Sequence, residues 1–238
     1  MGMGKGSRSS KAKRANAKAH ASRVKYDAAY TAKKDYIARP NAFLEKCLRR
    51  IAGNEASRHG SRRKHTRKPS RKRCALDIGL GQGRNAVLLA QRGYDTTGID
   101  RSEVGILAAQ RMAKTRGLRI NAVLADNETY DFGRNRWDLI VLLYYPQPMI
   151  LIDRLKAAVR PGGYILVERF SRPKANDPRD KREAKAPSPM LRCLADWRVL
   201  HYENDEFESD WHWNGESPRG AIVRVLARKP WARGSTKI

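Results

Sequence analysis

The chain has 238 residues, 40 % of them hydrophobic, which is enough to bury one full core. Its formal net charge is +26, and no apolar run reaches the about 18 residues that a membrane span needs, so the composition argues against a membrane protein. Three scattered cysteines, Cys47, Cys74 and Cys193, lack metal-ligand or redox spacing. We therefore expect no metal site and a cytoplasmic location, or a nuclear one in a nucleated cell.

Two basic segments carry much of the positive charge. Residues 1–25 hold eight Lys and Arg, residues 57–73 hold nine more, and neither segment has an acidic residue. Both lack apolar periodicity, so we expect a disordered basic tail and a basic insertion or loop. Such segments bind phosphate backbones without sequence preference. Contact with nucleic acid or a ribosome is one interpretation, and a solvated surface or a nuclear address is another.

The segment at residues 26–56 predicts N-terminal helical structure. Apolar residues recur there at helical spacing from Phe43 to Ile51, and Asn41 is expected to cap this helix. From residue 74 onward, strand and helix signals alternate. We expect strands at 74–79, 94–100, 119–126, 137–145 and 164–170, and helices at 84–93 (ending at Gly93), 102–117 (capped by Ser102) and 148–163 (halted by Pro161, Gly162 and Gly163).

This alternation predicts an α/β fold: a Rossmann-like, seven-stranded, mostly parallel sheet with helices on both faces. Two further strands, at 196–203 and 221–229, are separated by a polar loop without a helix, so the sheet is expected to end in a C-terminal antiparallel hairpin. A charged, proline-rich connection at 171–189 precedes this hairpin. The domain is expected to span residues 74–230, with a C-terminal tail at 231–238.

Three glycines follow the first predicted strand in "CALDIGLGQGRNAVLLA", at positions 79, 81 and 83. Glycine lets the backbone turn sharply and approach a ligand closely. Ligands of open parallel sheets bind at the carboxyl ends of the strands, where this turn lies. Read from Gly81, "GQGRNA" also satisfies the dinucleotide pattern G-x-G-x-x-A. A nicotinamide-dinucleotide oxidoreductase is therefore one alternative.

Three carboxylates at successive strand ends favour a different ligand. Asp77 precedes the glycines, where it would repel a pyrophosphate but can accept hydrogen bonds from a cationic aminoacyl group. Asp100 ends the second strand and can bind both hydroxyls of a ribose. Asp126 ends the third and can accept a hydrogen bond from an adenine amino group. Together they predict a ligand with an amine, a ribose and an adenine, but no phosphate.

The stretches "ALDIGLGQGRNAVLLAQRGYDTTGID", "WDLIVLLYY", "RPGGYILV", "DWRVLHYEND" and "VLARKP" resemble the class I S-adenosylmethionine-dependent methyltransferases. Within that class, the chain is most similar to the tellurite-resistance methyltransferase family, over residues 36–230. The resemblance implies S-adenosyl-L-methionine as cofactor and the transfer of its methyl group by in-line displacement.

The same resemblance implies a set of cofactor-binding residues: Arg39, Asp77, Gly79, Leu80, Gly81, Gly83, Asp100, Arg101, Asp126, Leu143 and Tyr144. Among them, Asp77 and the glycines would surround the methionine part, Asp100 would hold the ribose, and Asp126 would lie at the adenine. The two residues that end the fourth strand would lie near the transferable methyl group. Arg39 would meet the carboxylate of the cofactor.

The catalytic residues and the methyl acceptor stay open at this stage. An activated sulfonium needs positioning more than acid–base help, so no obligatory catalytic residue is expected. Tyr144, Tyr145 or Glu168 could remove a proton from the acceptor. A small-molecule acceptor is favoured, since the fourth strand is followed by "YYPQP" and not by an adenine-methylating signature. The alternative is an RNA- or ribosome-associated methyltransferase recruited by residues 1–25 and 57–73.

Overall fold

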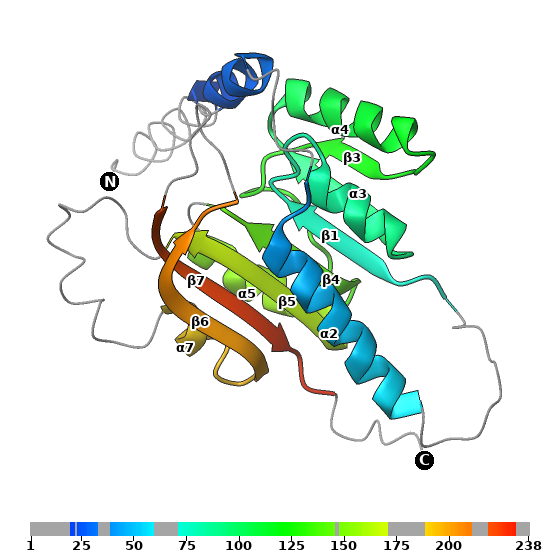
Figure 1. The fold of residues 1–238 in the computed structure, drawn as a ribbon, viewed down its shortest axis with the longest axis vertical. Coiled ribbons are helices and arrows are strands. Elements are labelled where there is room, and N and C mark those ends of the chain that lie inside the picture. The colour runs from blue at the N-terminus through cyan, green and yellow to red at the C-terminus, as the bar shows by residue number, and fades with distance from the viewer. Residues whose placement is uncertain are drawn as a thin grey trace, which may run out of the picture.

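The computed structural model describes residues 20–21, 23–32, 39–59, 71–145, 148–170, 189–210 and 219–231. Most of the two basic segments, nearly all of the connection at 171–189 and most of the C-terminal tail lie outside these ranges. Seven strands form one sheet in the order β3-β2-β1-β4-β5-β7-β6 (Figure 1). Their bounds are β1 Cys74–Ile78, β2 Asp95–Asp100, β3 Asn121–Leu124, β4 Trp137–Leu143, β5 Val159–Phe170, β6 Arg198–Glu208 and β7 Arg219–Arg228.

The pairing of the strands confirms the predicted fold class. β1 pairs in parallel with β2 and β4, β2 pairs in parallel with β3, and β4 with β5. β7 is antiparallel to both β5 and β6, so the sheet ends in an antiparallel hairpin. The carboxyl ends of the first five strands therefore lie along one edge of the sheet, where ligands of such folds bind.

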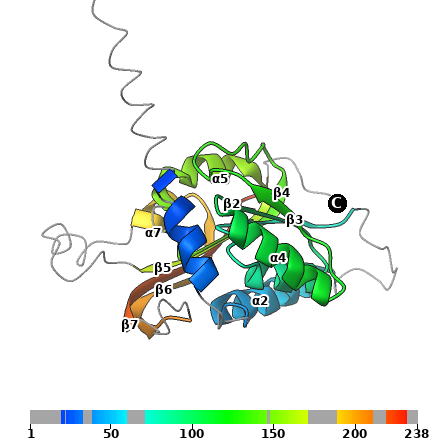
Figure 2. The same cartoon turned by 90° about the horizontal axis from the view of Figure 1, so that it is seen from above.

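Helices cover both faces of the sheet. Viewed from above, α2 and α4 lie on one side of it, and α5 and α7 lie on the other (Figure 2). A further helix covers residues 23–32 and lies across the carboxyl edge of the strands, beside α4. The labelled helices are α2 Ala42–His59, α3 Arg84–Gln91, α4 Glu103–Thr115, the 3-10 helix η1 Pro148–Ile150, α5 Ile152–Ala158 and α7 Pro189–Cys193.

The alternation of side chains along the central strands creates two apolar cores. Leu76 of β1 and Ile140 of β4 belong to the core shared with α5 and α7. Their neighbours Ala75 and Leu139 belong to the core shared with α2 and α3. Because successive residues of a strand point to opposite faces, a continuous apolar strand fills both cores at once. This explains why β1 and β4 are apolar apart from one aspartate each, Asp77 and Asp138.

The helix predicted at 148–163 ends earlier than expected. α5 ends at Ala158, and β5 begins at Val159, which pairs with Trp137 of β4. Gly162 lies inside this strand with a positive φ of 78°, and its N–H donates to the carbonyl oxygen of Lys229. The predicted stop at Pro161 is therefore wrong, because sheet pairing and not helix propensity decides the conformation there. The short helix α7 was not predicted either.

The ends of the two basic segments are also more ordered than the sequence suggests. Residues 23–25 are helical, and α2 continues to residue 59. At the start of β1, Arg73 forms an ion pair with Glu55 of α2 at 2.5 Å. Arg71 donates two hydrogen bonds to Asp138 at 2.8 and 2.5 Å. These ion pairs hold Arg71 and Arg73 to the folded part of the chain. The basic insertion expected at 57–73 is therefore shorter at its carboxyl end than predicted.

Candidate cofactor site

The glycine turn after β1 has left-handed backbone at all three glycines. The φ angles are 79° at Gly79, 54° at Gly81 and 90° at Gly83, which other residues rarely adopt. A Cβ at Gly83 would lie 2.7 Å from the Cβ of Ala109, whereas a Cβ at Gly79 would meet nothing within 4 Å. Gly83 therefore lets α3 pack against α4. Gly79 lines open space that a ligand can use.

Asp100, at the end of β2, braces this turn. Its Oδ2 accepts a hydrogen bond from the N–H of Gly81 at 2.8 Å, and its Oδ1 accepts one from the N–H of Ser102 at 2.9 Å. Burial raises the pKa of Asp100, and the bonds from these N–H groups oppose that rise. A carboxylate has about four lone-pair sites, so further acceptor capacity remains for a ligand hydroxyl.

Asp77 is a buried carboxylate beside the turn, with only 2 % of its surface exposed. One backbone hydrogen bond reaches it, from Ala86, while Oδ2 has no hydrogen-bond partner among the residues that the structure describes. Burial raises the pKa of Asp77 to about 8, against the attraction of Arg84. A buried acceptor without a partner is rare in folded proteins. The residues present therefore fit a ligand that brings an N–H donor to this position.

The end of β3 places Asp126 next to Arg101. Asp126 Oδ1 accepts hydrogen bonds from Arg101 Nη2 at 2.9 Å and from the N–H of Glu128 at 2.8 Å. The following residue, Asn127, is only 4 % exposed, and its side chain forms a hydrogen bond with Tyr145. Within the described ranges, Asn127 Oδ1 has no partner. Two adjacent residues thus offer acceptors here, and only Asp126 was predicted.

Leu143 and Tyr144 lie at the carboxyl end of β4, as expected. Tyr144 has a left-handed φ of 55°, and its N–H donates to the carbonyl oxygen of Glu168 in β5 at 2.7 Å. Burial and the nearby carboxylate of Glu168 raise the pKa of Tyr144. Its phenol is therefore neutral at ordinary pH and packs against the ring of Phe170, with 5.6 Å between the ring centroids.

A buried polar cluster lies beside Tyr144. Its members are Asn41, Arg84, Glu168, Asp210 and Arg224. Asn41 Nδ2 donates to Glu168 Oε1 at 2.6 Å and to Asp210 Oδ1 at 3.0 Å. Arg84 Nη2 donates to Asp210 Oδ1, and Arg224 Nε donates to Glu168 Oε2. Asn41 also caps α2, as predicted, by accepting from the N–H of Leu44.

Sequence patterns did not predict this buried polar cluster as a unit, because its members come from five separate parts of the chain. The available signals were the cap at Asn41 and the position of Arg84 directly after the glycine turn. Arg84 Nη1 also donates to the carbonyl oxygen of Arg39 at 3.2 Å. The side chain of Arg39 is exposed, and its predicted contact with a ligand carboxylate remains a prediction.

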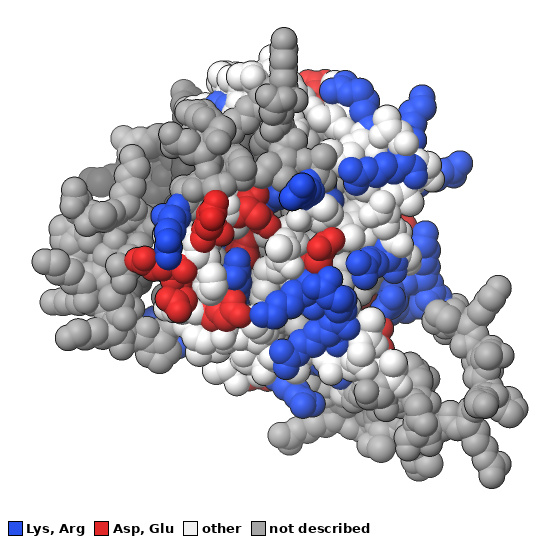
Figure 3. All heavy atoms as spheres, viewed as in Figure 1, with Lys and Arg blue, Asp and Glu red and all other residues white. Residues whose placement is uncertain are grey.

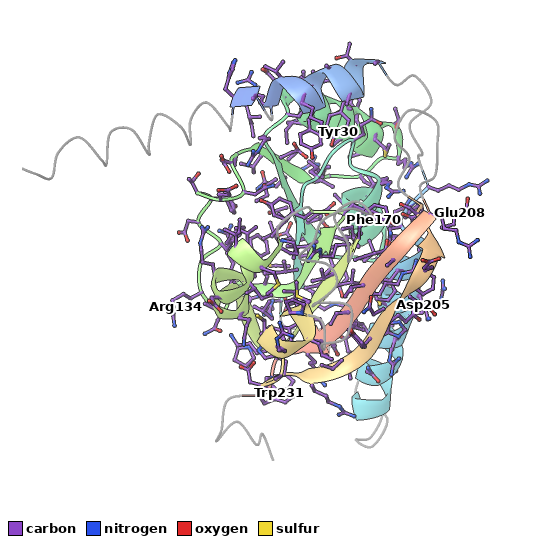
Figure 4. All side chains as sticks on the ribbon, turned by 90° about the vertical axis from the view of Figure 1, so that its left-hand side faces the viewer. Tyr30, Arg134, Phe170, Asp205, Glu208 and Trp231 are labelled. Carbon is purple, nitrogen blue, oxygen red and sulfur yellow. The ribbon has the colours of Figure 1, made fainter. Side chains whose placement is uncertain are left out.

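The helix at 23–32 closes the edge of the site next to α4. Asp27 accepts a hydrogen bond from Ser102 Oγ at 2.5 Å, and Arg23 pairs with Glu103 at 3.4 Å. Tyr30 points from this helix toward the sheet (Figure 4), and its hydroxyl lies 3.1 Å from where a Cβ of Gly81 would be. Sequence patterns did not predict these contacts, although two tyrosines at helical spacing (residues 26 and 30) gave a local signal.

Known proteins resemble this chain in sequence and in fold. A family model described as "Methyltransferase domain" matches residues 75–163. Hemagglutinin 1 of Eikenella corrodens is 37 % identical over 143 residues, covering 54 % of this chain and 45 % of that protein. The probable S-adenosyl-L-methionine-dependent methyltransferase TehB of Haemophilus influenzae is 27 % identical over 164 residues, covering 65 % and 56 %. The crystal structure of TehB from Haemophilus influenzae superposes with a TM-score of 0.53 and 22 % identity, covering 74 % and 62 %.

Residues 75–163 match the model of a methyltransferase domain, and the strand order and the glycine turn agree with this match. The resemblance stated from the sequence is confirmed, and within this class the chain is similar to TehB. The chain spans about half the length of the curated relatives it matches. No helix in the described ranges is long and apolar enough to cross a membrane.

Proposed function

We propose that this chain binds S-adenosyl-L-methionine at the glycine turn and transfers its methyl group to a small-molecule acceptor. The observation that carries the proposal is the open space at Gly79 beside the unpartnered Oδ2 of buried Asp77. The relative TehB is named as a probable S-adenosyl-L-methionine-dependent enzyme, and two structures of magnesium protoporphyrin IX methyltransferase with the same fold hold the cofactor or its demethylated product.

The residues of the chain would act by binding and positioning. When bound, S-adenosyl-L-methionine supplies a methyl group that its positively charged sulfur has already activated. Asp77 would receive the ammonium group, and the free lone pairs of Asp100 would receive the ribose hydroxyls. Leu143 and Tyr144 would border the path of the methyl group. Holding donor and acceptor in line supplies most of the rate enhancement that such a displacement needs.

The carboxylate of Asp77 also argues against the dinucleotide alternative. A cationic amine held by the turn would lower the pKa of this buried carboxyl group and pair with its ionised form, whereas the negative charges of a pyrophosphate would raise that pKa further and form no ion pair. A cationic amine at the same place neutralises that carboxylate. The proposed function thus predicts binding of S-adenosylhomocysteine and no binding of NAD or NADP.

A small acceptor is favoured by the acidic surface over β6 and β7 (Figure 3). Exposed acidic side chains of β6, at Asp205, Glu206 and Glu208, lie close in sequence to Asp210 of the buried polar cluster. Acidic residues gather over β6 and β7, whereas basic residues cover the side of α2 and α3 (Figure 3). A phosphate backbone would be repelled on the acidic side. A neutral or cationic small molecule would not be repelled there.

The test of cofactor binding is isothermal titration calorimetry with S-adenosylhomocysteine. The unaltered chain should bind, and both Gly79→Ala and Asp77→Asn should weaken binding at least about tenfold, since each removes a contact or the space for one. Asp100→Ala should abolish binding, but it also removes the brace of the turn. Asp196→Asn, on an exposed carboxylate, is the matched control. Binding of NAD in place of S-adenosylhomocysteine would overturn the proposal.

The acceptor class needs a separate experiment. The chain is incubated with cofactor labelled at the methyl group and with a fractionated cell extract. Label in the small-molecule fraction is expected. Label in RNA that disappears when residues 1–25 and 57–73 are deleted would instead favour a methyltransferase recruited by its basic segments, with binding that weakens steeply as salt rises.

A further inference from the structure

The sheet carries exposed positive charge along its amino edge, which is the edge where the parallel strands begin and which lies opposite the cofactor site. β6 also begins there, because β6 and β5 are both antiparallel to β7. Basic residues from five separate parts of the chain meet at this edge, and we call them the amino-edge row. They are Lys72 before β1, Arg92 before β2, Arg119 before β3, Arg136 before β4 and Arg198 at the start of β6.

The amino-edge row keeps its charge available to a partner. All five side chains belong to exposed residues, and none forms an ion pair with a described residue. Asp138 and Asp196 lie close in sequence to the row, but each already pairs with another cation. Asp95, exposed at the start of β2, offsets at most one of the five charges. Basic side chains also gather around the carboxyl ends of α3 and α4, on the right in Figure 3.

The arrangement of the row fits an extended anion. The strands β3, β2, β1 and β4 are neighbours in the sheet, so their four basic residues are spread over three strand spacings, or about 14 Å. One small anion would meet only part of this row, whereas the backbone of a nucleic acid presents negative charges along its whole length. Four of the five residues are arginines, whose guanidinium groups bind phosphate through paired N–H donors.

An aromatic side chain lies at the same edge. Trp231 follows the end of β7 and is 50 % exposed. Arg228 Cζ lies 5.2 Å from the centroid of its ring, and Arg228 pairs in register with Arg198 of the row. Trp231 and Tyr30, which lies over the glycine turn, are at opposite ends of the molecule (Figure 4). Exposed aromatic rings beside cations are the means by which proteins bind single-stranded nucleic acids, because bases stack on the rings.

We propose that the amino edge of the sheet binds a single-stranded nucleic acid, with phosphates on the amino-edge row and a base on Trp231. The inference goes beyond the proposed function and needs no cofactor. Because this edge lies opposite the glycine turn, the bound strand anchors the chain and is not the methyl acceptor. RNA and DNA share the phosphate backbone that the row recognises, so the experiment includes both.

The experiment is fluorescence anisotropy of the full chain with labelled uridine RNA and thymidine DNA strands of about 20 nucleotides, over a series of salt concentrations. Binding of either strand supports the proposal, and the tighter one identifies the source. The triple variant Lys72→Gln, Arg92→Gln and Arg119→Gln should reduce the slope of log affinity against log salt by about 2, since each phosphate contact contributes about 0.7. Its affinity for S-adenosylhomocysteine should stay unchanged.

Arg198 and Arg219 provide a matched pair at opposite ends of one hairpin. Each is the exposed first residue of its strand, but Arg219 pairs with Glu208 and lies far from the amino edge. Arg198→Gln should weaken binding of the strand at least about twofold, and Arg219→Gln, with the same loss of charge, should leave it unchanged. Trp231→Ala should weaken binding about fivefold or more, and Trp231→Phe, which keeps a ring for stacking, should restore most of it.

Each contrary outcome overturns the inference in its own way. Equal weakening by Arg198→Gln and Arg219→Gln would mean that the strand binds through the overall charge of the chain and not at the amino edge. Binding to vesicles that contain phosphatidylserine, without binding of either strand at about 50 mM salt, would make the edge a lipid-binding surface. Competition between the strand and S-adenosylhomocysteine would place the strand at the cofactor site. Should the triple variant not fold, as judged by circular dichroism, the matched pair still decides.

Discussion

Asn41 Nδ2 lies 2.6 Å from Glu168 Oε1, although 127 residues separate them in the chain and neither residue is exposed to solvent. The other carboxylate oxygen of Glu168 pairs with Arg224 Nε at 2.5 Å. Glu168 thus connects the start of α2, the end of β5 and the middle of β7. Its charge is compensated within the protein, so we expect its main role to be structural support of the site beside Tyr144.

Removing this carboxylate should destabilise the fold strongly. Glu168→Ala removes the carboxylate that pairs with Arg224 Nε and accepts from Asn41, and this loss from a fully buried site should lower the free energy of unfolding by about 3–5 kcal/mol. Glu168→Gln keeps the bond to Asn41 and should cost less. Urea denaturation measures both. Glu206→Ala, at an exposed site of β6, should change stability by no more than about 0.5 kcal/mol and serves as the control. Equal losses for Glu168→Ala and Glu206→Ala would contradict the structural role.

The raised pKa of Asp77 predicts a dependence of stability on pH. Burial raises this pKa from 3.8 to about 8 in the folded chain. Between these values the folded chain keeps a proton that the unfolded chain has released. The contribution of Asp77 to stability is therefore fully present below pH 3.8 and is lost as the pH rises through about 8.

Asp77→Asn should remove this dependence, because an amide does not titrate. The variant should be more stable than the unaltered chain at pH 8.5 and closer to it at pH 5, and the stability gap between the two proteins should widen by roughly 4 kcal/mol between these pH values. Urea unfolding at the two pH values measures the change. Parallel behaviour of the two proteins across this range would show that Asp77 is ionised throughout. The same substitution should weaken S-adenosylhomocysteine binding, so stability and ligand affinity should move in opposite directions.

Local patterns were sufficient to predict most of the fold. The cap at Ser102, the apolar strands β1 and β4 and the left-handed glycines all depend on interactions within a few residues. The three carboxylates Asp77, Asp100 and Asp126 could be placed at one edge because parallel strands bring their carboxyl ends together. For the same reason the glycine turn is recognisable from its residues and their spacing alone.

Contacts between distant segments could not be predicted in this way. α5 ends at Ala158 because the next residue pairs with β4, and nothing near Pro161 encodes that pairing. Its position at a strand end predicts an adenine contact for Asp126, but only the structure shows that Arg101 already forms an ion pair with its carboxylate. The free oxygen of Asn127 is likewise visible only once burial and partners are known.

The helix at 23–32 should protect the peptide bond after Lys25 from trypsin while it is docked. Asp27 holds it to the cap of α4 through Ser102 Oγ, and the loss of one such hydrogen bond costs about 1 kcal/mol. Asp27→Ala should therefore speed trypsin cleavage after Lys25 roughly fivefold, if cleavage follows the population of the undocked helix. Val24→Ala, at a side chain 53 % exposed on the same helix, should leave the rate unchanged.

A double-mutant cycle separates docking from helix propensity. In a Ser102→Ala background, the contact is already absent, so Asp27→Ala should add little further acceleration. If the two substitutions accelerate cleavage independently, Asp27 stabilises the helix by other means, such as its ion pair with Arg23 at 3.5 Å.

Gly83 and Gly93 provide a matched pair for the glycine turn. Both have positive φ, at 90° and 83°, so alanine at either position meets the same unfavourable backbone conformation, at a cost of about 1–2 kcal/mol. The surroundings differ. A Cβ at Gly93 meets nothing within 4 Å, whereas a Cβ at Gly83 would lie 2.7 Å from the Cβ and 2.8 Å from the Cα of Ala109. Gly83→Ala must therefore push α3 and α4 apart.

We expect Gly93→Ala to lower the free energy of unfolding by the backbone cost alone and Gly83→Ala to lower it by at least about 2 kcal/mol more, as overpacking in a tight core does. Urea denaturation of the two variants measures the difference, in which the shared backbone cost cancels. Gly83→Ala should also reduce S-adenosylhomocysteine affinity, because α3 begins directly after the turn and its displacement moves Gly81 away from Asp100. Equal stability of the two variants would mean that α4 moves to make room for the added methyl group without a loss of stability. In that case the turn would depend on its backbone angles and not on the packing of Ala109.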